Sequence, residues 1–208
     1  LLGSGRTELA LSLFGMTRPD SGKLYLDSKP VRFRGHEDAI KAGIGYVSED
    51  RLTLGLVQQQ SVADNAVLTI LDKLRGRFRL IDDYRKNRIV AEWIAKLGVR
   101  VADPDQAVST LSGGNQQKIV LAKWVLTQPR ILILDSPTVG VDVGAKASIY
   151  QLIHLLAQEG IAILLISDEV PEVYYNCDRV LHFSGGSVIG EYLPEQVSQQ
   201  QLAEAVNA

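Results

Sequence analysis

Two uninterrupted apolar runs constrain the fold of this chain more than any other feature of its sequence. Ile131–Leu134 and Ile161–Ile166 have the length of β-strands and lack the polar alternation of a half-exposed strand. Such runs are typical of central parallel strands, which are buried on both faces. Residues 144–158 between them are expected to form a helix. A strand, a helix and a second strand in this order predict a right-handed crossover in a largely parallel sheet, and therefore an α/β layered fold.

Shorter segments continue the alternation of strands and helices on both sides of this unit. The sequence predicts strands at 23–27, 30–34, 43–48 and 179–183, and helices at 7–14, 37–42, after Pro171 and near 198–206. It also predicts a helical insert at about 60–128, with helices at 66–74 behind an N-cap at Ser61, from Asp82 to Gly98, and at 119–126.

Length, charge and cysteine content exclude several classes of protein. The 208 residues suit one domain. With 22 Lys and Arg against 24 Asp and Glu, the net charge of −2 argues against nucleic-acid binding by bulk electrostatics. Cys177 is the single cysteine, so we expect no disulfide within the chain. The apolar runs are far too short to span a bilayer, and no basic leader precedes an apolar segment. We therefore predict a soluble, cytoplasmic chain.

Two weaker patterns favour ordinary structural roles. Basic residues at 75–88, with Phe78 and Tyr84 among them, would suit a nucleic acid, but three acidic residues interrupt the stretch: Asp72, Asp82 and Asp83. We interpret it as the solvated surface of the helical insert. Histidines at 36, 154 and 182 are scattered relative to Cys177, so we expect no metal site built from protein ligands alone.

The most specific motif directly precedes the predicted helix at 119–126. It consists of Leu111, Ser112, Gly113, Gly114, Asn115 and Gln116. A serine hydroxyl, glycine amides free of side-chain obstruction and a helix N-terminus together make an anion site that suits phosphate. The alternative is a glycine-rich turn in which the serine is only an N-cap.

Asp135 stands at the C-terminal end of the first apolar run. Open parallel sheets bind ligands at that edge, where a carboxylate can hold the water shell of a Mg²⁺ ion. The alternative is that the carboxylate merely caps a turn.

The first residues of the chain have the form of the end of a phosphate-binding loop, G-x-x-x-x-G-K-[ST]. The matching residues are Gly3, Ser4, Gly5, Arg6 and Thr7, with the threonine in the place of a Mg²⁺ ligand. Arginine stands where lysine belongs, and the first glycine of the pattern would precede Leu1. The alternative is a helix that begins after a glycine turn.

Together these motifs resemble the nucleotide-binding domain of ATP-binding-cassette (ABC) transporters along essentially the whole chain. Leu111–Lys118 resembles the signature motif, and Ile131–Asp135 resembles the Walker B strand. Gly140-Val141-Asp142 resembles the D-loop, and Tyr46–Arg51 lies where the Q-loop would be. More narrowly, G-S-G-R-T-E-L, Y-V-S-E-D-R, L-S-G-G-N-Q-Q-K and G-V-D-V-G-A-K resemble the second half of tandem ATPases from bacterial monosaccharide importers of the ribose, galactose and xylose type.

The resemblance implies the architecture of one ABC nucleotide-binding domain over residues 1–208. Its P-loop NTPase-like core would comprise about 1–55 and 129–208, and a helical subdomain with the signature motif would comprise about 56–128. A start inside the phosphate loop implies the C-terminal cassette of a tandem polypeptide without its leading strands.

Four positions depart from the pattern of a competent cassette. The phosphate-loop lysine of the family is replaced by Arg6, and the glutamate after Walker B by Ser136. Glu49 stands in place of the Q-loop glutamine, and Asp168 in place of the switch histidine. The planar guanidinium of arginine does not replace a compact ammonium group against phosphates. Serine cannot act as the carboxylate base that polarises water, and an aspartate would repel the γ-phosphate.

The resemblance therefore implies a divided role for this domain. Its own site, with Thr7 and Asp135 as weak Mg²⁺ ligands, would bind ATP weakly and not hydrolyse it. Its signature motif and D-loop would complete the ATP site of the first cassette in trans, within a transport ATPase that drives sugar uptake. The implied partners are that first cassette, permease subunits docking around residues 49–62 at the cytoplasmic face of the plasma membrane, and indirectly a periplasmic sugar-binding protein. The alternative is a non-hydrolytic nucleotide-binding or regulatory module.

Overall fold

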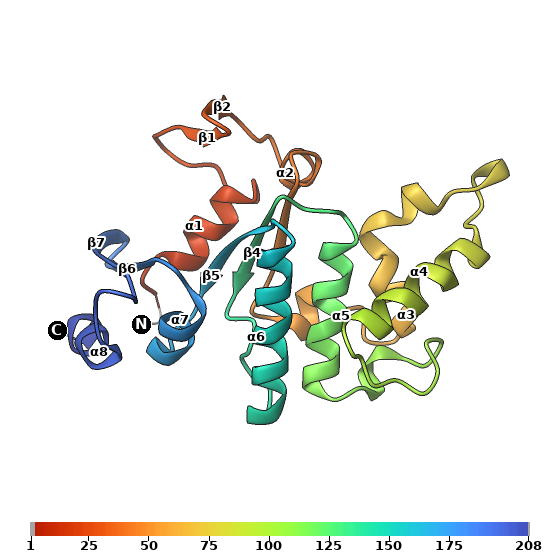
Figure 1. Ribbon diagram of the computed structural model, residues 1–208. Helices are drawn as coiled ribbons and strands as arrows, with labels where there is room; N and C mark the ends of the chain where they lie inside the picture. The colour runs from red at the N-terminus through yellow and green to blue at the C-terminus, as the bar shows by residue number, and fades with distance from the viewer. Residues whose placement is uncertain (1–2, 208) are drawn as a thin grey trace.

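A three-stranded parallel sheet forms the centre of the protein (Figure 1). The computed structural model describes residues 3–207; the start of the chain at Leu1 and Leu2, and Ala208, lie outside the described residues. The strand order is β3 (Ile44–Val47), β4 (Ile131–Asp135) and β5 (Ala162–Ile166). The two apolar runs of the sequence are therefore neighbouring parallel strands, as predicted.

The middle strand is buried because helices cover both faces of the sheet. Ile133 packs with residues of α1 (Arg6–Leu13) and α2 (His36–Lys41) in one apolar cluster, whereas Leu132 and Leu134 belong to the larger cluster on the other face. The predicted crossover helix is α6 (Val143–Gln158). This packing leaves the carboxyl ends of β4 and β5 at one edge, where the candidate site lies.

The predicted helical insert contains three α-helices and three short helical turns, and a fourth turn directly precedes it. The α-helices are α3 (Val62–Val67), α4 (Asp83–Lys96) and α5 (Gly113–Val125), and the turns are η1 (Arg51–Gly55), η2 (Leu68–Leu74), η3 (Arg77–Arg79) and η4 (Val108–Thr110). Buried side chains of α3 and α5 belong to the same apolar cluster as the sheet. The insert therefore shares a core with the rest of the chain, and the division at residues 55 and 129 stays a prediction.

The segment predicted as a helix at 66–74 is helical but divided, because α3 ends at Val67 and residues 68–74 form a 3-10 helix. Ser61 is the predicted N-cap, with its hydroxyl accepting a hydrogen bond from the Asp64 amide at 2.9 Å, so α3 begins directly after it. The chain then tightens into the 3-10 turn η2, where Ile70 leaves helical geometry. In this turn the hydroxyl of Thr69 donates to the Lys123 carbonyl on α5. A tertiary contact therefore accompanies the break, and local periodicity does not reveal it.

Two small hairpins flank the sheet. Near the N-terminus, β1 (Leu24–Leu26) pairs with β2 (Lys29–Val31), and both are shorter than the predicted strands at 23–27 and 30–34. Near the C-terminus, α7 (Val170–Asn176) leads to β6 (Val180–Ser184), β7 (Ser187–Tyr192) and α8 (Gln199–Asn207). The sequence predicted β6 but not β7, whose residues are mostly exposed and lack an apolar run.

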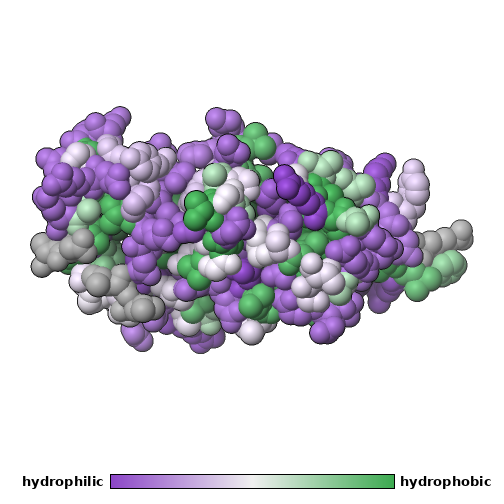
Figure 2. Space-filling model, turned by 90° about the horizontal axis from the view of Figure 1, so that it is seen from below, coloured by the Kyte–Doolittle hydropathy of each residue, from purple (hydrophilic) through white to green (hydrophobic). Residues whose placement is uncertain are grey.

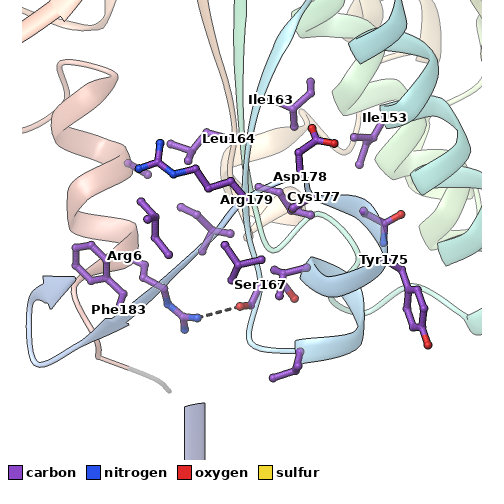
Figure 3. Close-up of a pocket in the computed structure, with 18 of the residues that line it drawn as sticks. Arg6, Ile153, Ile163, Leu164, Ser167, Tyr175, Cys177, Asp178, Arg179 and Phe183 are labelled. Carbon is purple, nitrogen blue, oxygen red and sulfur yellow. Dashed lines mark hydrogen bonds between the residues drawn. The ribbon is translucent and has the colours of Figure 1, made fainter. Parts of the chain in front are cut away.

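A cavity of about 680 Å³ lies beside β5. Its walls come from β5, β6, α1, α6 and α7, and Figure 3 looks into it. Within the described residues, β5 pairs with β4 alone. Arg6, Ser167 and Asp168 line one part of this cavity, which places the candidate phosphate loop at its wall.

Candidate functional site

The glycine-rich start of the chain turns directly into α1. Gly3 and Gly5 have φ values of +77° and +94°, which favour glycine, and a Cβ on Gly5 would come within 3.1 Å of Gly186 Cα. The Ser4 carbonyl accepts a hydrogen bond of 2.9 Å from the Gly186 amide, which fixes the loop against the β6–β7 turn. The segment has the geometry of a loop that presents amides at a helix N-terminus.

Arg6 does not point freely into this loop. Its guanidinium forms an ion pair with Asp168 and donates a hydrogen bond of 2.9 Å to the Ser167 carbonyl, drawn as a dashed line in Figure 3. Asp168 follows the end of β5, so the contact joins residues 162 positions apart. Two of the four departures from the family pattern therefore contact each other. The guanidinium in the phosphate-loop position is thus paired with a carboxylate of the protein itself.

Asp135 lies at the end of β4 and is almost fully buried. One carboxylate oxygen, Oδ2, accepts a hydrogen bond of 3.1 Å from the Tyr46 hydroxyl of β3, while Oδ1 has no partner among the described residues. Burial, and then the charge of Asp135, raise the pKa of Tyr46 well above its ordinary value, so the tyrosine stays a donor. The second oxygen can accept hydrogen bonds from water in the shell of a cation.

The other predicted nucleotide and catalytic positions follow the strands or begin α1. Ser136 follows Asp135 with a φ of +48°, and its amide donates to the Ile166 carbonyl at 2.9 Å. Glu49, two residues beyond β3, is exposed, and Thr7 is exposed in the first turn of α1. No carboxylate follows Asp135, so the end of β4 offers a hydroxyl where a general base would be needed.

The signature-like motif begins α5. Leu111 is buried, Ser112 is the exposed N-cap residue, and its hydroxyl accepts a hydrogen bond of 3.1 Å from Asn115. Gln116 is buried and donates to the Val108 carbonyl at 3.3 Å. The serine hydroxyl and the first amides of α5 are thus presented at the surface by a buried scaffold.

The two glycines of this motif allow close packing against the segment that resembles the D-loop. A Cβ on Gly114 would lie 2.5 Å from the Cβ of Ala145 in α6, and a Cβ on Gly113 would lie 3.1 Å from the Gly140 carbonyl oxygen. Val141 is buried beside them, and Asp142 caps α6 by accepting a bond of 2.9 Å from the Ala145 amide. The predicted motif and D-loop therefore form one continuous surface.

Sequence reasoning missed the residue that holds this surface together. The guanidinium of Arg51, in η1, donates to the carbonyls of Val139 and Gly140 at 2.6 and 2.9 Å and lies against Gly113. It connects the segment after β3 with the signature motif and the D-loop. Its place in Y-V-S-E-D-R was visible in the sequence, but its partners are 88 and 89 residues away.

A buried polar network links the D-loop region to the end of β5, and the sequence did not predict it. Glu172 of α7 accepts hydrogen bonds from Thr138 at 2.7 Å and Ser167 at 2.6 Å, and pairs with Lys146 at 3.1 Å. Burial alone would raise the pKa of Glu172, but the bonds from Ser167, Thr138, Tyr150 and Lys146 outweigh it and lower that pKa. Since Arg6 binds the Ser167 carbonyl, this network also supports the Arg6 contact.

The phosphate loop and the signature motif do not meet. In Figure 1 the starts of α1 and α5 lie on opposite sides of α6. Among residues 3–207, no three His, Cys, Asp or Glu side chains are grouped to hold a metal ion. In the same part of the chain, no helix is long and apolar enough to cross a bilayer.

Comparison with known proteins points to one family. Residues 2–139 match the family model described as ABC transporter. A ribose import ATP-binding protein of Rubrobacter xylanophilus is 45% identical over 97% of this chain and 40% of its own length. A xylose import ATP-binding protein of Escherichia coli is 44% identical over 99% of this chain and 40% of its own length. The chain thus spans about 40% of these relatives.

Solved structures share the fold at low sequence identity. A nucleotide-free ATP-binding cassette from an ABC transporter superposes with a TM-score of 0.81 at 19% identity, covering 99% of this chain and 81% of that one. A dimeric cassette in a post-hydrolysis state, bound to ADP and phosphate, gives a TM-score of 0.77 at 20% identity and covers 92% and 82% of the two chains. The α/β cassette fold predicted from the sequence is confirmed.

Proposed function

The chain belongs to the ABC transporter family as an ATP-binding domain, and from this we propose that it is the second cassette of a bacterial sugar importer. The kinship with ribose and xylose import proteins supports the transport role. In this proposal the domain lends its signature motif to the ATP site of a first cassette. Its own phosphate loop contributes little to binding and nothing to hydrolysis.

The observation that carries the proposal is the contact between Arg6 and Asp168. An arginine engaged by a carboxylate offers less charge to a phosphate, and the same carboxylate repels that phosphate. Ser136 adds to this, since a hydroxyl cannot take a proton from an attacking water as a glutamate would. Glu49 gives a third departure, because a carboxylate replaces the neutral amide of a Q-loop glutamine.

Mg²⁺ fits the residues that remain, although weakly. Asp135 has a buried oxygen without a partner among the described residues, which suits a metal-bound water, and Thr7 presents a hydroxyl at the start of α1. When bound, the ion would screen the charge of the phosphate oxygens. These two residues would hold nucleotide and ion in place without a neighbouring base to activate water.

The signature surface has the features of a contact between cassettes. Ser112 is exposed at the N-terminus of α5, where helix amides favour an anion. Val139 and Val143, on either side of the D-loop, are exposed apolar residues. A partner cassette that covers these residues would place its phosphate beside Ser112.

The remaining partners follow from the same proposal. Leu52, Leu54 and Val57 form an exposed apolar strip within residues 49–62, the segment expected to dock on the permease. Through that permease the protein would lie at the cytoplasmic face of the plasma membrane and act with a periplasmic sugar-binding protein. We expect no nucleic-acid partner.

The test is ATP turnover by the reassembled tandem protein carrying single substitutions in this domain. Ser112→Arg should abolish turnover, whereas Arg6→Ala should leave most of it intact. Ser109→Arg, at an exposed serine three residues before Ser112, controls for an added arginine. Loss of hydrolysis in Arg6→Ala, with Ser112→Arg active, would overturn the proposal. Activity in all three variants would favour the alternative, a non-hydrolytic regulatory module.

A further inference from the structure

The projecting end of the helical insert, residues 75–85, is the part of the surface that the proposed ATPase role leaves unexplained; we call it the tip. In Figure 1 it extends away from the body between η2 and α4. Backbone hydrogen bonds close it: the Gly76 amide donates to the Leu80 carbonyl at 2.8 Å, and the Asp82 amide to the Leu74 carbonyl at 3.0 Å. The tip is therefore a defined hairpin-like loop.

Large apolar side chains stand exposed on this loop. Phe78, Leu80 and Tyr84 have 82%, 70% and 80% of their surface accessible, and Ile81 is also exposed. Phe78 has a φ of +65°, an uncommon value for a residue other than glycine. Figure 2 shows hydrophobic atoms at the far right end of the molecule, the end at which Figure 1 draws the tip. Exposed apolar side chains gathered on a strained projection indicate a contact surface.

Basic residues surround these apolar side chains. Residues 72–88 contain seven basic and three acidic residues, a net charge of +4 in a chain whose total is −2. The acidic residues are already engaged: Asp72 pairs with Arg75, Asp82 caps α4, and Asp83 lies 3.8 Å from Lys86. Exposed arginines at 79, 85 and 88 make no ion pair with any described residue. The local charge therefore attracts anions although the whole chain is slightly acidic.

We propose that the tip binds an anionic phospholipid surface, with its apolar side chains at the headgroup level and its arginines on lipid phosphates. Aromatic and apolar side chains flanked by cations are the combination that stabilises peripheral binding at the membrane interface. Leu80 and Ile81 are aliphatic and offer no stacking surface to bases. The acidic remainder of the chain opposes a long nucleic acid. A projecting loop, by contrast, reaches a flat bilayer without bringing that acidic surface close.

The experiment is co-sedimentation of this chain with vesicles of phosphatidylglycerol mixed with phosphatidylcholine, and with vesicles of phosphatidylcholine alone, at low and at physiological salt. The wild type should bind the anionic vesicles, and this binding should weaken as the salt concentration rises. Arg79→Gln with Arg85→Gln should lower partitioning roughly 25-fold at low salt, since each charge contributes about fivefold. Phe78→Ser with Leu80→Ser should reduce it at least tenfold at either salt concentration.

Matched controls lie elsewhere on the surface. Arg32→Gln with Arg34→Gln removes two exposed arginines, and Val188→Ser with Ile189→Ser removes two exposed apolar side chains of β7. Both should bind like the wild type. Circular dichroism checks folding, and Tyr84→Ser is a milder replacement should the double tip variant misfold.

Three results would overturn the inference. The first is absence of binding to anionic vesicles at low salt, and the second is equal loss in tip and control variants. The third is binding to poly-glutamate or to short duplex DNA that is as tight as binding to the vesicles and equally sensitive to the tip variants, which would assign the tip to an acidic protein or a nucleic acid.

Discussion

Lys123 is expected to make the stability of this protein rise with pH above about 8. The side chain is buried in α5, with Nζ 5.7 Å from the ring centroid of Trp124 and a hydrogen bond to the Gly55 carbonyl of η1. Burial lowers the pKa of Lys123 from 10.5 to about 8. The folded protein therefore disfavours the charged form of a lysine that the unfolded chain readily protonates.

The size of the effect follows from that difference. Below pH 8 the lysine is protonated in both the folded and the unfolded state, and burying its charge lowers the free energy of unfolding. The pKa difference of about 2.5, at about 1.4 kcal/mol for each pKa unit, corresponds to about 3 kcal/mol. Between pH 8 and 10.5 the unfolded chain binds the proton more strongly, so raising the pH relieves the cost. Above pH 10.5 the lysine is neutral in both states.

The assay is urea unfolding of the wild type and of Lys123→Met from pH 7 to 10.5. The unfolding free energy of the wild type, taken relative to the variant, should rise by about 3 kcal/mol across this range. Taking the difference cancels the contribution of Cys177, whose pKa burial raises to about 11 and whose effect has the opposite sign. Lys73→Met is the control, because Lys73 is exposed with Nζ 3.4 Å from the Thr127 carbonyl. A difference that stays constant with pH refutes the reasoning.

Three further substitutions test the contacts around the site. Glu172→Gln should lower the free energy of urea unfolding at pH 7 by about 2 kcal/mol. Because the pKa of Glu172 is lowered, the difference in unfolding free energy from the wild type should shrink as the pH falls below 4.5. A difference unchanged by acid would contradict the network. Gly114→Ala should lower the unfolding free energy by about 1–3 kcal/mol because the added Cβ clashes with Ala145, and adding Ala145→Gly should restore part of that stability. A double variant no more stable than the single variant would exclude the clash. Arg51→Ala should speed hydrogen exchange at the Leu54 amide of η1, and unchanged protection would mean that Arg51 does not hold this turn.

The sequence could predict the sheet and the motifs because burial leaves a local signature. The apolar run at 131–134 is buried within a parallel sheet. Asp82 caps α4 by accepting a hydrogen bond from the Arg85 amide, only three residues along the chain. The break at Ile70 and the strand β7 escaped prediction because tertiary packing and hairpin pairing determine them.

The candidate site likewise contains features that the sequence could predict and contacts that it could not. Arg6 and Asp168 were each identified as departures from the family pattern, yet their contact spans 162 positions and no local pattern reveals it. Glu172 was missed because a glutamate in a short helix looks like an ordinary surface residue until its buried partners are known. Residue types therefore indicated the chemistry of the site, whereas the pairing of Arg6 with Asp168 required the structure.

The most direct test of the central claim is calorimetric titration of the chain with Mg-ATP, for the wild type and for Asp168→Asn. If Asp168 neutralises Arg6, the wild type should bind far more weakly than micromolar. Removing the carboxylate's charge should then tighten binding about fivefold, the value of about 1 kcal/mol for a partly exposed pair. Sub-micromolar binding by the wild type, unchanged in Asp168→Asn, would contradict the account.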